Sequence, residues 1–265
     1  MSEASDRDES LVEVADWFGS HEDLSLQFAR ILRKALDEVI DGGRTSRWSV
    51  ESLEKTEKTY IGTKIEILLK YEMKMIDGNV LDTLIAGHEV DIKCTVLNNW
   101  MIPREAVGQL CLLLRIDDVH NVFQVGLIRA TDLVLTTAGN RDGKRSISSQ
   151  GRGHIRWLVE NGSLPANFLS TITDETRRQI MRHRSGQSRV NELFRLVQGR
   201  IINRNALETV ARQLDPMKRM RDARAPLLKE GILVLGHQDE DPGTARRYGL
   251  PVPAKGEAIS VRVSS

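Results

Sequence analysis

Apolar residues recur at helical spacing early in the chain and form continuous runs further on. In residues 24–40 they fall three or four positions apart, which predicts an amphipathic helix closed by the glycines of residues 41–43. Residues 49–71 predict a second helical region. Three apolar runs then predict strands over residues 89–97, 109–116 and 122–130. This order predicts an α/β core whose second strand, which contains Cys111, is central.

The pattern changes after the third predicted strand. Residues 139–153 are polar and rich in glycine, which predicts a loop. Residues 160–167 contain glycine, serine and proline between two patterned segments and predict a domain boundary. We therefore expect a first domain over residues 1–159, a linker over 160–167 and a second domain over 168–265.

The second domain is predicted to be mainly helical. Helices are expected from Asp174 onward, over residues 189–199, and over residues 206–214 with Asn205 as the N-cap. Two helices joined by a short connection predict a helix-turn-helix. The apolar run 231–236 predicts a strand that would form part of a wing.

Charge is distributed unevenly although the chain as a whole carries only +1. Residues 1–140 have 15 Lys and Arg against 24 Asp and Glu, whereas residues 141–224 have 18 against 8. A basic segment of this kind is typical of phosphate contact, and its alternative is a solvated helical surface. The candidate DNA contacts in or near it are Lys144, Arg145, Arg189, Arg195, Asn205, Lys218, Arg219 and Arg221.

Composition narrows the cellular setting. The chain is 40% hydrophobic, and no apolar run approaches the roughly 18 residues that a membrane-spanning helix needs. Residues 2–10 are acidic and polar and predict a solvated tail rather than a targeting signal. Cys94 and Cys111 lie in apolar runs without zinc-site spacing, which predicts buried free thiols and a cytoplasmic location.

The densest group of candidate catalytic residues surrounds the first predicted strand. Alternate side chains of a strand share one face, so Asp91 and Lys93 should point the same way and Ile92 into the core. A carboxylate beside an ammonium, with Asp82 and Glu66 upstream, is what metal-assisted phosphodiester cleavage requires. The triplet is also common as an ordinary ion pair on a solvated strand, and the pattern alone leaves both interpretations open.

Other chemistries find less support in the sequence. His88 and His237 are further candidates for catalysis, and for His88 a turn residue contacting solvent or DNA is favoured over a metal ligand. No serine has the His and Asp setting of a triad, and no glycine motif forms a phosphate-binding loop. Acyl transfer and ATP chemistry are therefore not expected.

Six blocks of sequence closely resemble segments of the NaeI-type restriction endonucleases and keep that family's order. The blocks are residues 56–67, 85–93, 139–145, 188–195, 231–239 and 249–253. They span the chain from about residue 24 to the C-terminus. Several coincident blocks are highly specific, and on them the chain is identified as a member of this family.

The resemblance implies a Mg²⁺-dependent type II endonuclease that cuts double-stranded DNA and leaves 5′-phosphate and 3′-hydroxyl ends. It implies an α/β cleavage domain with a PD-(D/E)xK restriction-endonuclease-like core. It also implies a C-terminal, mainly helical, winged helix-turn-helix domain like that of catabolite activator protein. The family is dimeric and binds two DNA copies, one as substrate and one as effector, so a homodimer is expected.

Carried onto this chain, the resemblance gives a complete catalytic set. The implied catalytic residues are Glu66, Asp82, Asp91 and Lys93. The expected Mg²⁺ ligands are Asp82, Asp91 and Glu66, joined by the backbone carbonyl of Ile92. Two alternatives stay open: a nuclease or nickase that acts on modified DNA, and a winged-helix regulator that binds DNA without cleaving it. The intact catalytic set argues against the regulator.

Overall fold

The computed structural model describes residues 8–213 and 215–263, which fall into two compact units. The first unit contains the described residues up to Val39 together with Glu54–Pro165. The second contains Ile40–Leu53 together with the described residues from Ala166 onward. The chain therefore passes between the units three times, and each unit is built from two separate stretches of sequence.

These limits differ in two ways from the domains expected from the sequence. The last passage between the units, at Pro165, lies within the predicted linker 160–167, but residues 160–163 complete a strand, Arg156–Ser163, of the first unit. The segment 40–53 belongs to the second unit because Trp48, only 4% exposed, lies among that unit's apolar side chains. A local sequence pattern cannot predict that Trp48 packs against residues more than a hundred positions later in the chain.

Two predicted segments reach residues outside the described part of the chain. The expected solvated tail over residues 2–10 lies outside it up to residue 7, and Asp8 then caps the first helix by accepting a hydrogen bond from the backbone of Leu11. The helix expected over residues 206–214 ends at Ala211 in the structure, and its last predicted residue, Leu214, also lies outside the described residues.

A six-stranded sheet organises the first unit, with the strand order β1–β2–β3–β5–β6–β8. The β3–β5 pair is parallel, and the other neighbours are antiparallel. The helices are α1 (Glu9–Gly19), α2 (Leu24–Ile40) and α4 (Lys55–Glu72), with 3-10 helices η2 (Arg104–Ala106) and η3 (Gly151–His154). The strands are β1 (Ile76–Asp77), β2 (Thr83–Ile85), β3 (His88–Thr95), β4 (Met101–Ile102), β5 (Leu110–Asp117), β6 (Val122–Arg129), β7 (Arg145–Ser146) and β8 (Arg156–Ser163). Strands β4 and β7 form a separate two-stranded ribbon.

The three strands predicted from apolar runs are confirmed as β3, β5 and β6. Strand β5 lies between β3 and β6 and is buried on both faces, as a central strand must be. Cys111 and Leu113 point into one apolar cluster, which the segments after β3 and β6 complete. Cys94 and Cys111 are free, and burial raises the pKa of the Cys111 thiol to about 12.

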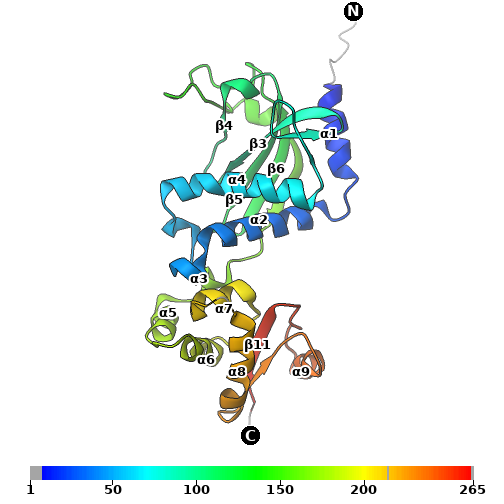
Figure 1. Ribbon diagram of the computed structural model, residues 1–265. Coiled ribbons are helices and arrows are strands. Elements are labelled where there is room, and N and C mark those ends of the chain that lie inside the picture. The colour runs from blue at the N-terminus through cyan, green and yellow to red at the C-terminus, as the bar shows by residue number, and fades with distance from the viewer. Residues whose placement is uncertain (1–7, 214, 264–265) are drawn as a thin grey trace, which may run out of the picture. The chain divides into compact units, whose positions relative to one another are not determined.

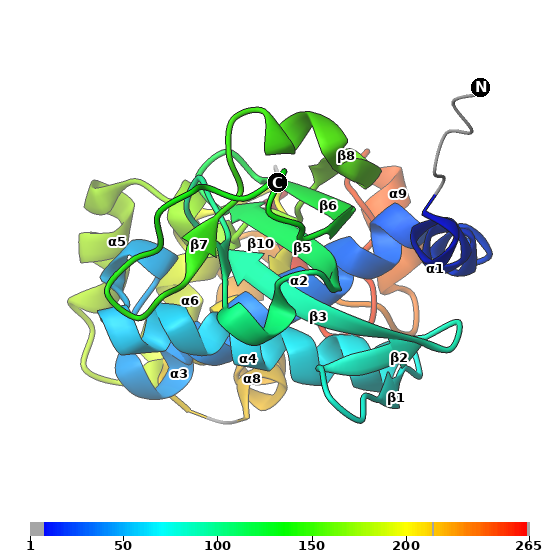
Figure 2. The ribbon, with the colours of Figure 1, turned by 90° about the horizontal axis from the view of Figure 1, so that it is seen from above.

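Helices α2 and α4 lie side by side against the sheet (Figures 1 and 2). The prediction of α2 is confirmed, but no glycine ends it: Asp41 takes the left-handed conformation, and Gly42–Thr45 form a short helix. The second helical region begins at Lys55, where Glu54 and Glu57 form a capping box. Gly62 does not break α4, and a side chain there would meet Cys94 of β3 at ordinary contact distance.

The second unit combines short helices with a three-stranded antiparallel sheet in the order β10–β11–β9. Its helices are α3 (Gly42–Thr45), α5 (Asp174–Met181), α6 (Gly186–Leu196), α7 (Arg204–Ala211), α8 (Pro216–Leu228) and α9 (Asp241–Arg247), with 3-10 helices η1 (Val50–Ser52) and η4 (Phe168–Thr171). Its strands are β9 (Ile202–Asn203), β10 (Ile232–Leu235) and β11 (Glu257–Arg262). A short connection joins α7 to α8, and Leu214 within it lies outside the described residues.

One local prediction in this unit is wrong in its details. The N-cap of α7 is Asn203, whose side chain accepts a hydrogen bond from the backbone of Ala206 at 2.9 Å, and Asn205 lies inside the helix. Asn203 ends β9, so the strand places its side chain at the start of the helix.

None of the described helices is both long enough and apolar enough to cross a membrane.

Candidate active site

Asp91 and Lys93 meet on one face of β3, as their spacing predicts. The ammonium of Lys93 donates to Asp91 Oδ1 at 2.8 Å and to the carbonyl of Ile92 at 3.2 Å. Asp91 is only 4% exposed, and its Oδ2 is buried without a hydrogen-bond partner, although it also lies 2.8 Å from the Lys93 nitrogen. The pair is therefore a partly dehydrated charge pair in which the Lys93 ammonium faces both oxygens of Asp91.

Burial changes the proton affinity of both groups. It raises the pKa of Asp91 to about 6, against the opposing effect of the Lys93 ammonium, and the nearby Asp82 carboxylate adds to the increase. Burial lowers the pKa of Lys93, but the hydrogen bond and charge of Asp91 and the charge of Asp82 outweigh it, so the pKa of Lys93 is raised. Lys93 therefore stays charged, and Asp91 is the group closest to losing its charge.

Asp82 is placed by the hairpin formed by β2 and β3. It directly precedes β2, whose antiparallel pairing sets Leu84 opposite Glu89. Asp82 Oδ2 accepts a hydrogen bond from the backbone nitrogen of Ile92 at 2.6 Å and lies 3.7 Å from Lys93 Nζ. The turn of the hairpin therefore brings Asp82 back to the middle of β3, a contact that the sequence interval alone does not reveal.

Glu66 enters the same region from α4. Its Oε1 lies 2.9 Å from the ammonium of Lys70, which also donates to the backbone carbonyl of Asp82 at 3.2 Å. Glu66 is thus linked to Asp82 through Lys70, and Asp82 and Asp91 are linked through Lys93. The structure brings all four predicted catalytic residues into one neighbourhood. Glu66 is connected to Asp82 by way of Lys70, and Asp82 to Asp91 by way of Lys93.

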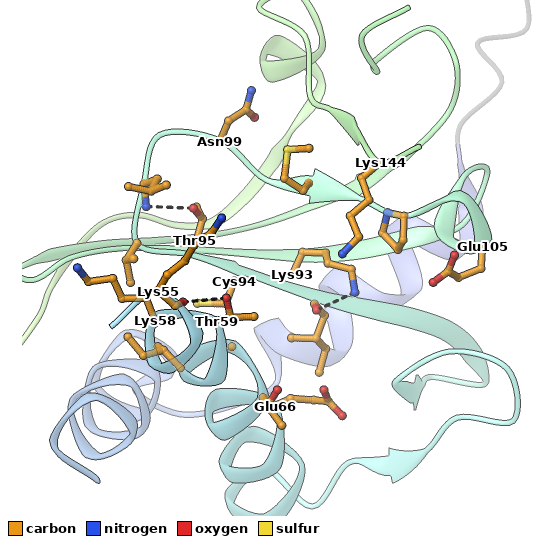
Figure 3. Close-up of a pocket in the computed structure, with 18 residues that line it drawn as sticks. Lys55, Lys58, Thr59, Glu66, Lys93, Cys94, Thr95, Asn99, Glu105 and Lys144 are labelled. Atoms are coloured by element: carbon orange, nitrogen blue, oxygen red, sulfur yellow. Dashed lines mark hydrogen bonds between the residues drawn. The ribbon is translucent and has the colours of Figure 1, made fainter. Parts of the chain in front are cut away.

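A groove of about 640 Å³ reaches Glu66 and Lys93, whereas Asp82 and Asp91 do not line it and lie behind Lys93 through their contacts with it. Glu66, Ile92 and Lys93 line it, and in Figure 3 Glu66 and Lys144 approach Lys93 from opposite sides. Lys55 and Lys58, from the first turns of α4, line the groove as well. An open groove with lysines along its walls and carboxylates near its floor suits a polyanion that is cut at a cation site.

The donor set fits a hard divalent cation by its chemistry. Carboxylates of Asp82, Asp91 and Glu66 and the carbonyl of Ile92 are the oxygen ligands that such a cation prefers, and the buried Oδ2 of Asp91 accepts no hydrogen bond, although the Lys93 ammonium lies 2.8 Å from it. Within the described ranges, no three His, Cys, Asp or Glu side chains already converge as a metal cluster. Lys70 and Lys93 instead occupy oxygens of this set.

The expected DNA contacts of the first unit differ in accessibility. Lys144 is exposed and lines the groove. Arg145 is half-buried, forms an ion pair with Asp132 and donates to the carbonyl of Thr136 at 2.5 Å, so it braces its own loop. This loop is partly regular, because Arg145 and Ser146 form β7 against β4.

Two expected contacts in the second unit are engaged internally. Arg189 is 7% exposed and donates to the carbonyls of Val210 and Ala211 at 2.7 and 2.8 Å, which gives it a structural role in place of the expected DNA contact. Arg195 binds Glu230 with two hydrogen bonds of 2.8 Å and also pairs with Glu192. Burial and pairing of this kind depend on the fold, and basic residues in a sequence do not reveal them.

The other expected contacts of this unit are more accessible. Arg221 is exposed on α8 and Arg219 is half-buried, whereas Lys218 is exposed but lies 2.7 Å from Asp222. Asn205 is exposed in the first turn of α7. Helix α8 therefore presents a basic surface in its first half.

Several lysines in or beside the candidate active site were not predicted from the sequence. Lys70 lies four residues after Glu66, and this spacing predicts an ion pair along a helix. The spacing could therefore have indicated that Lys70 contacts Glu66. Lys55 and Lys58 carried no distinctive pattern. His88, considered as a ligand, instead places Nε2 2.6 Å from Glu13 of α1.

Comparison with known proteins agrees with the geometry. Residues 14–265 match the family model described as restriction endonuclease NaeI. The chain is also 44% identical over 246 residues to a protein from Lentzea aerocolonigenes named type II restriction enzyme NaeI, with 89% of this chain and 77% of that protein covered. The chain therefore belongs to the NaeI family of type II restriction endonucleases.

Proposed function

We propose that this site-specific DNA endonuclease hydrolyses the phosphodiester bond in the groove above Asp91 and Lys93, with Mg²⁺ as its cofactor. The observation that carries the proposal is the arrangement on β3. The buried carboxylate of Asp91 faces the Lys93 ammonium with both of its oxygens, and Asp82 is held against the same strand by the backbone of Ile92. Carboxylates with a raised pKa beside a specific charged partner are more typical of functional sites than of ordinary strand faces.

Four groups would hold the cation. They are the carboxylates of Asp82, Asp91 and Glu66 and the backbone carbonyl of Ile92. When bound, Mg²⁺ would offset the negative charge that develops on the phosphate and lower the pKa of a water molecule. The carboxylates of Asp82 and Asp91 are already fixed by hydrogen bonds, so little reorganisation of these side chains is needed.

Lys93 would act on the phosphate and on the attacking water. Its raised pKa keeps the side chain protonated at neutral pH, which suits a charge donor better than a general base. Its ammonium has three donors, and those used on Asp91 and Ile92 leave one that can face the groove. That donor would stabilise the additional negative charge of the pentacovalent phosphate.

DNA would reach the groove along its lysines. Lys144 on one side of Lys93 and Lys55 on α4 are exposed and line the same groove. Such contacts position the phosphate backbone and do not distinguish bases. The residues that choose the recognition sequence are a separate set.

The second unit is proposed to be a winged helix-turn-helix domain that binds DNA. Support comes from the element order α6, β9, α7, α8, β10, α9, β11 and from the antiparallel sheet β10–β11–β9. A four-residue connection, one residue of which lies outside the described part, joins α7 to α8. By this arrangement α8, the second helix of the α7–α8 pair, would enter the major groove.

Neutralising Arg219 and Arg221 with glutamine should weaken DNA binding and reduce its dependence on salt. For every phosphate that is no longer bound, the slope of log affinity against log salt should fall by up to about one. Affinity measured by fluorescence anisotropy at several salt concentrations gives the slope. Lys229→Gln, just beyond the other end of α8, is the control. An unchanged slope in the double variant would remove this surface from the interface.

The active unit is proposed to be a homodimer. The described part of the chain brings together one set of the proposed catalytic groups, so two copies related by a two-fold axis would cut both strands of a palindromic site together. Binding of a further DNA copy as effector belongs to the same proposal. Sedimentation of the protein with and without DNA, and the rate of cutting substrates with one or two sites, test these two points.

The direct test of the proposed function is incubation of the purified protein with large unmodified DNAs, in Mg²⁺ or in EDTA, followed by sequencing of the ends. Discrete fragments that form only with Mg²⁺ support it and give the recognition site. Binding without cutting, when a two-site substrate is also left intact, would instead favour modified DNA as the substrate or a regulator that does not cleave. Single-strand breaks alone would indicate a nickase.

A further inference from the structure

The Lys70 side chain contacts three acceptors around the candidate active site. Its ammonium lies 2.9 Å from Glu66 Oε1 on α4, 3.2 Å from Asp77 Oδ1 on β1, and 3.2 Å from the backbone carbonyl of Asp82, to which it donates. An ammonium has three donors, so these acceptors account for all of them. Lys70 thus joins one predicted metal ligand to the main chain of another.

This arrangement exceeds an ordinary ion pair along a helix. The spacing of Glu66 and Lys70 alone gives a pair on one helix face, but two of the three acceptors come from outside α4. The Lys70 side chain is only 23% exposed, which shields it from solvent more than most helix-surface lysines. Hydrogen bonding raises its pKa, with Glu66 making the largest contribution, so the side chain is a permanent positive charge.

The contacts of Lys70 leave carboxylate oxygens of Glu66 and Asp82 available to a cation. Lys70 binds Oε1 of Glu66, which leaves Oε2 as the oxygen that a cation can approach. At Asp82, Lys70 binds the backbone carbonyl, while the carboxylate is held separately by the nitrogen of Ile92. Glu66 and Asp82 are therefore fixed in place with carboxylate oxygens still able to accept a cation.

We propose that Lys70 is a positioning residue for DNA cleavage: it orients Glu66 and the chain at Asp82 so that a divalent cation meets a preformed set of oxygens. This inference rests on the proposed function. Without Lys70, the like charges of Glu66 and Asp77 would no longer share a cation, and Glu66 would turn toward solvent. Loss of a group that orients a metal ligand weakens metal affinity by roughly 10- to 100-fold.

Lys64 provides a matched control on the same helix. Its side chain is also 23% exposed and also forms an ion pair, with Glu38 of α2, but it does not line the groove. Its pKa is raised by that partner as well. Lys64→Met therefore removes a comparable charge and ion pair from α4 without touching Glu66 or Asp82.

The experiment titrates the full-length wild type, Lys70→Met and Lys64→Met with Mn²⁺ alone, an oxygen-preferring ion whose free form is measured by electron paramagnetic resonance. Cleavage rates are measured in parallel against Mg²⁺ concentration. Lys70→Met should bind Mn²⁺ roughly 10- to 100-fold more weakly and need correspondingly more Mg²⁺ for half-maximal cleavage. Lys64→Met should match the wild type, and Lys70→Arg should recover part of the affinity because it restores the charge.

The outcomes separate the two proposals. If the wild type neither binds Mn²⁺ nor cleaves with Mg²⁺, the proposed function fails. If the wild type binds and cleaves but Lys70→Met has unchanged or tighter Mn²⁺ affinity, the positioning role of Lys70 is overturned. Thermal unfolding of each variant identifies a folding defect, and in that case Lys70→Gln, which keeps a donor at this position, replaces Lys70→Met in the same comparison.

Discussion

Replacement of Lys93 by methionine should lower the cleavage rate by at least about 10²- to 10³-fold, the usual effect of removing one donor from a developing negative charge. Methionine keeps the length and apolar stem of the side chain but removes the ammonium that binds Asp91 and Ile92. DNA affinity should change little, because the other lysines of the groove and the basic surface of α8 remain. Single-turnover cleavage and anisotropy on the same oligonucleotide measure the two properties.

Lys34→Met is a suitable control for this variant. Lys34 pairs with Glu72 at 3.0 Å and is about half exposed, away from the groove lining. It should cleave at the wild-type rate. Loss of DNA binding in Lys93→Met, at the same level as the loss of cleavage, would mean that Lys93 is needed to bind the substrate and would contradict its assignment to the chemical step.

Asp91→Asn should stabilise the metal-free protein at neutral pH while it abolishes cleavage. The pKa of Asp91 is raised from its ordinary value near 3.8 to about 6, so the folded state binds a proton more tightly than the unfolded state. Asp91 therefore favours folding below about pH 4, and that contribution disappears as pH rises through about 6. A shift of about two pKa units corresponds to roughly 3 kcal/mol, which Asn avoids because it carries no charge.

Urea unfolding in EDTA from pH 4 to pH 8 measures this effect. The difference in free energy of unfolding between Asp91→Asn and the wild type should grow between pH 4 and pH 6 and then level off. Asp117→Asn, on the neighbouring strand β5, is the control: burial would raise the pKa of Asp117, but hydrogen bonds with His120 outweigh it and lower that pKa below its ordinary 3.8. Its contribution to stability therefore changes only below about pH 4, and its difference from the wild type should stay nearly constant from pH 4 to pH 8. A constant difference for Asp91→Asn across the range would contradict the raised pKa.

The local parts of the fold were predictable because their causes are local. Apolar runs of strand length gave β3, β5 and β6, and the alternation of β3 placed Asp91 and Lys93 on one face. The amphipathic pattern of α2 also predicted its limits correctly. In each case the side chains that decide the structure lie within a few residues of one another.

The unpredicted features depend on contacts between distant segments. Strand β2 has only three residues and exists because it pairs with β3, so its own pattern could not reveal it. Arg189 is buried because the end of α7 supplies carbonyl acceptors about twenty residues later in the chain. Lys70 similarly acquires its role from Asp77 and the backbone of Asp82, which only the fold brings to it.

The division of the second unit between two stretches of sequence affects how its proposed DNA-binding surface could have been inherited. Asn167 donates to the carbonyl of Trp48 at 2.8 Å, and Arg177 lies over the Trp48 ring at 4.6 Å, so residues 40–53 are part of this unit's interior. A gene segment encoding residues 166–265 alone would lack that tryptophan. The two units are therefore poorly suited to exchange as independent modules, and recombination that replaced the C-terminal part would have to preserve a strip of sequence between α2 and α4.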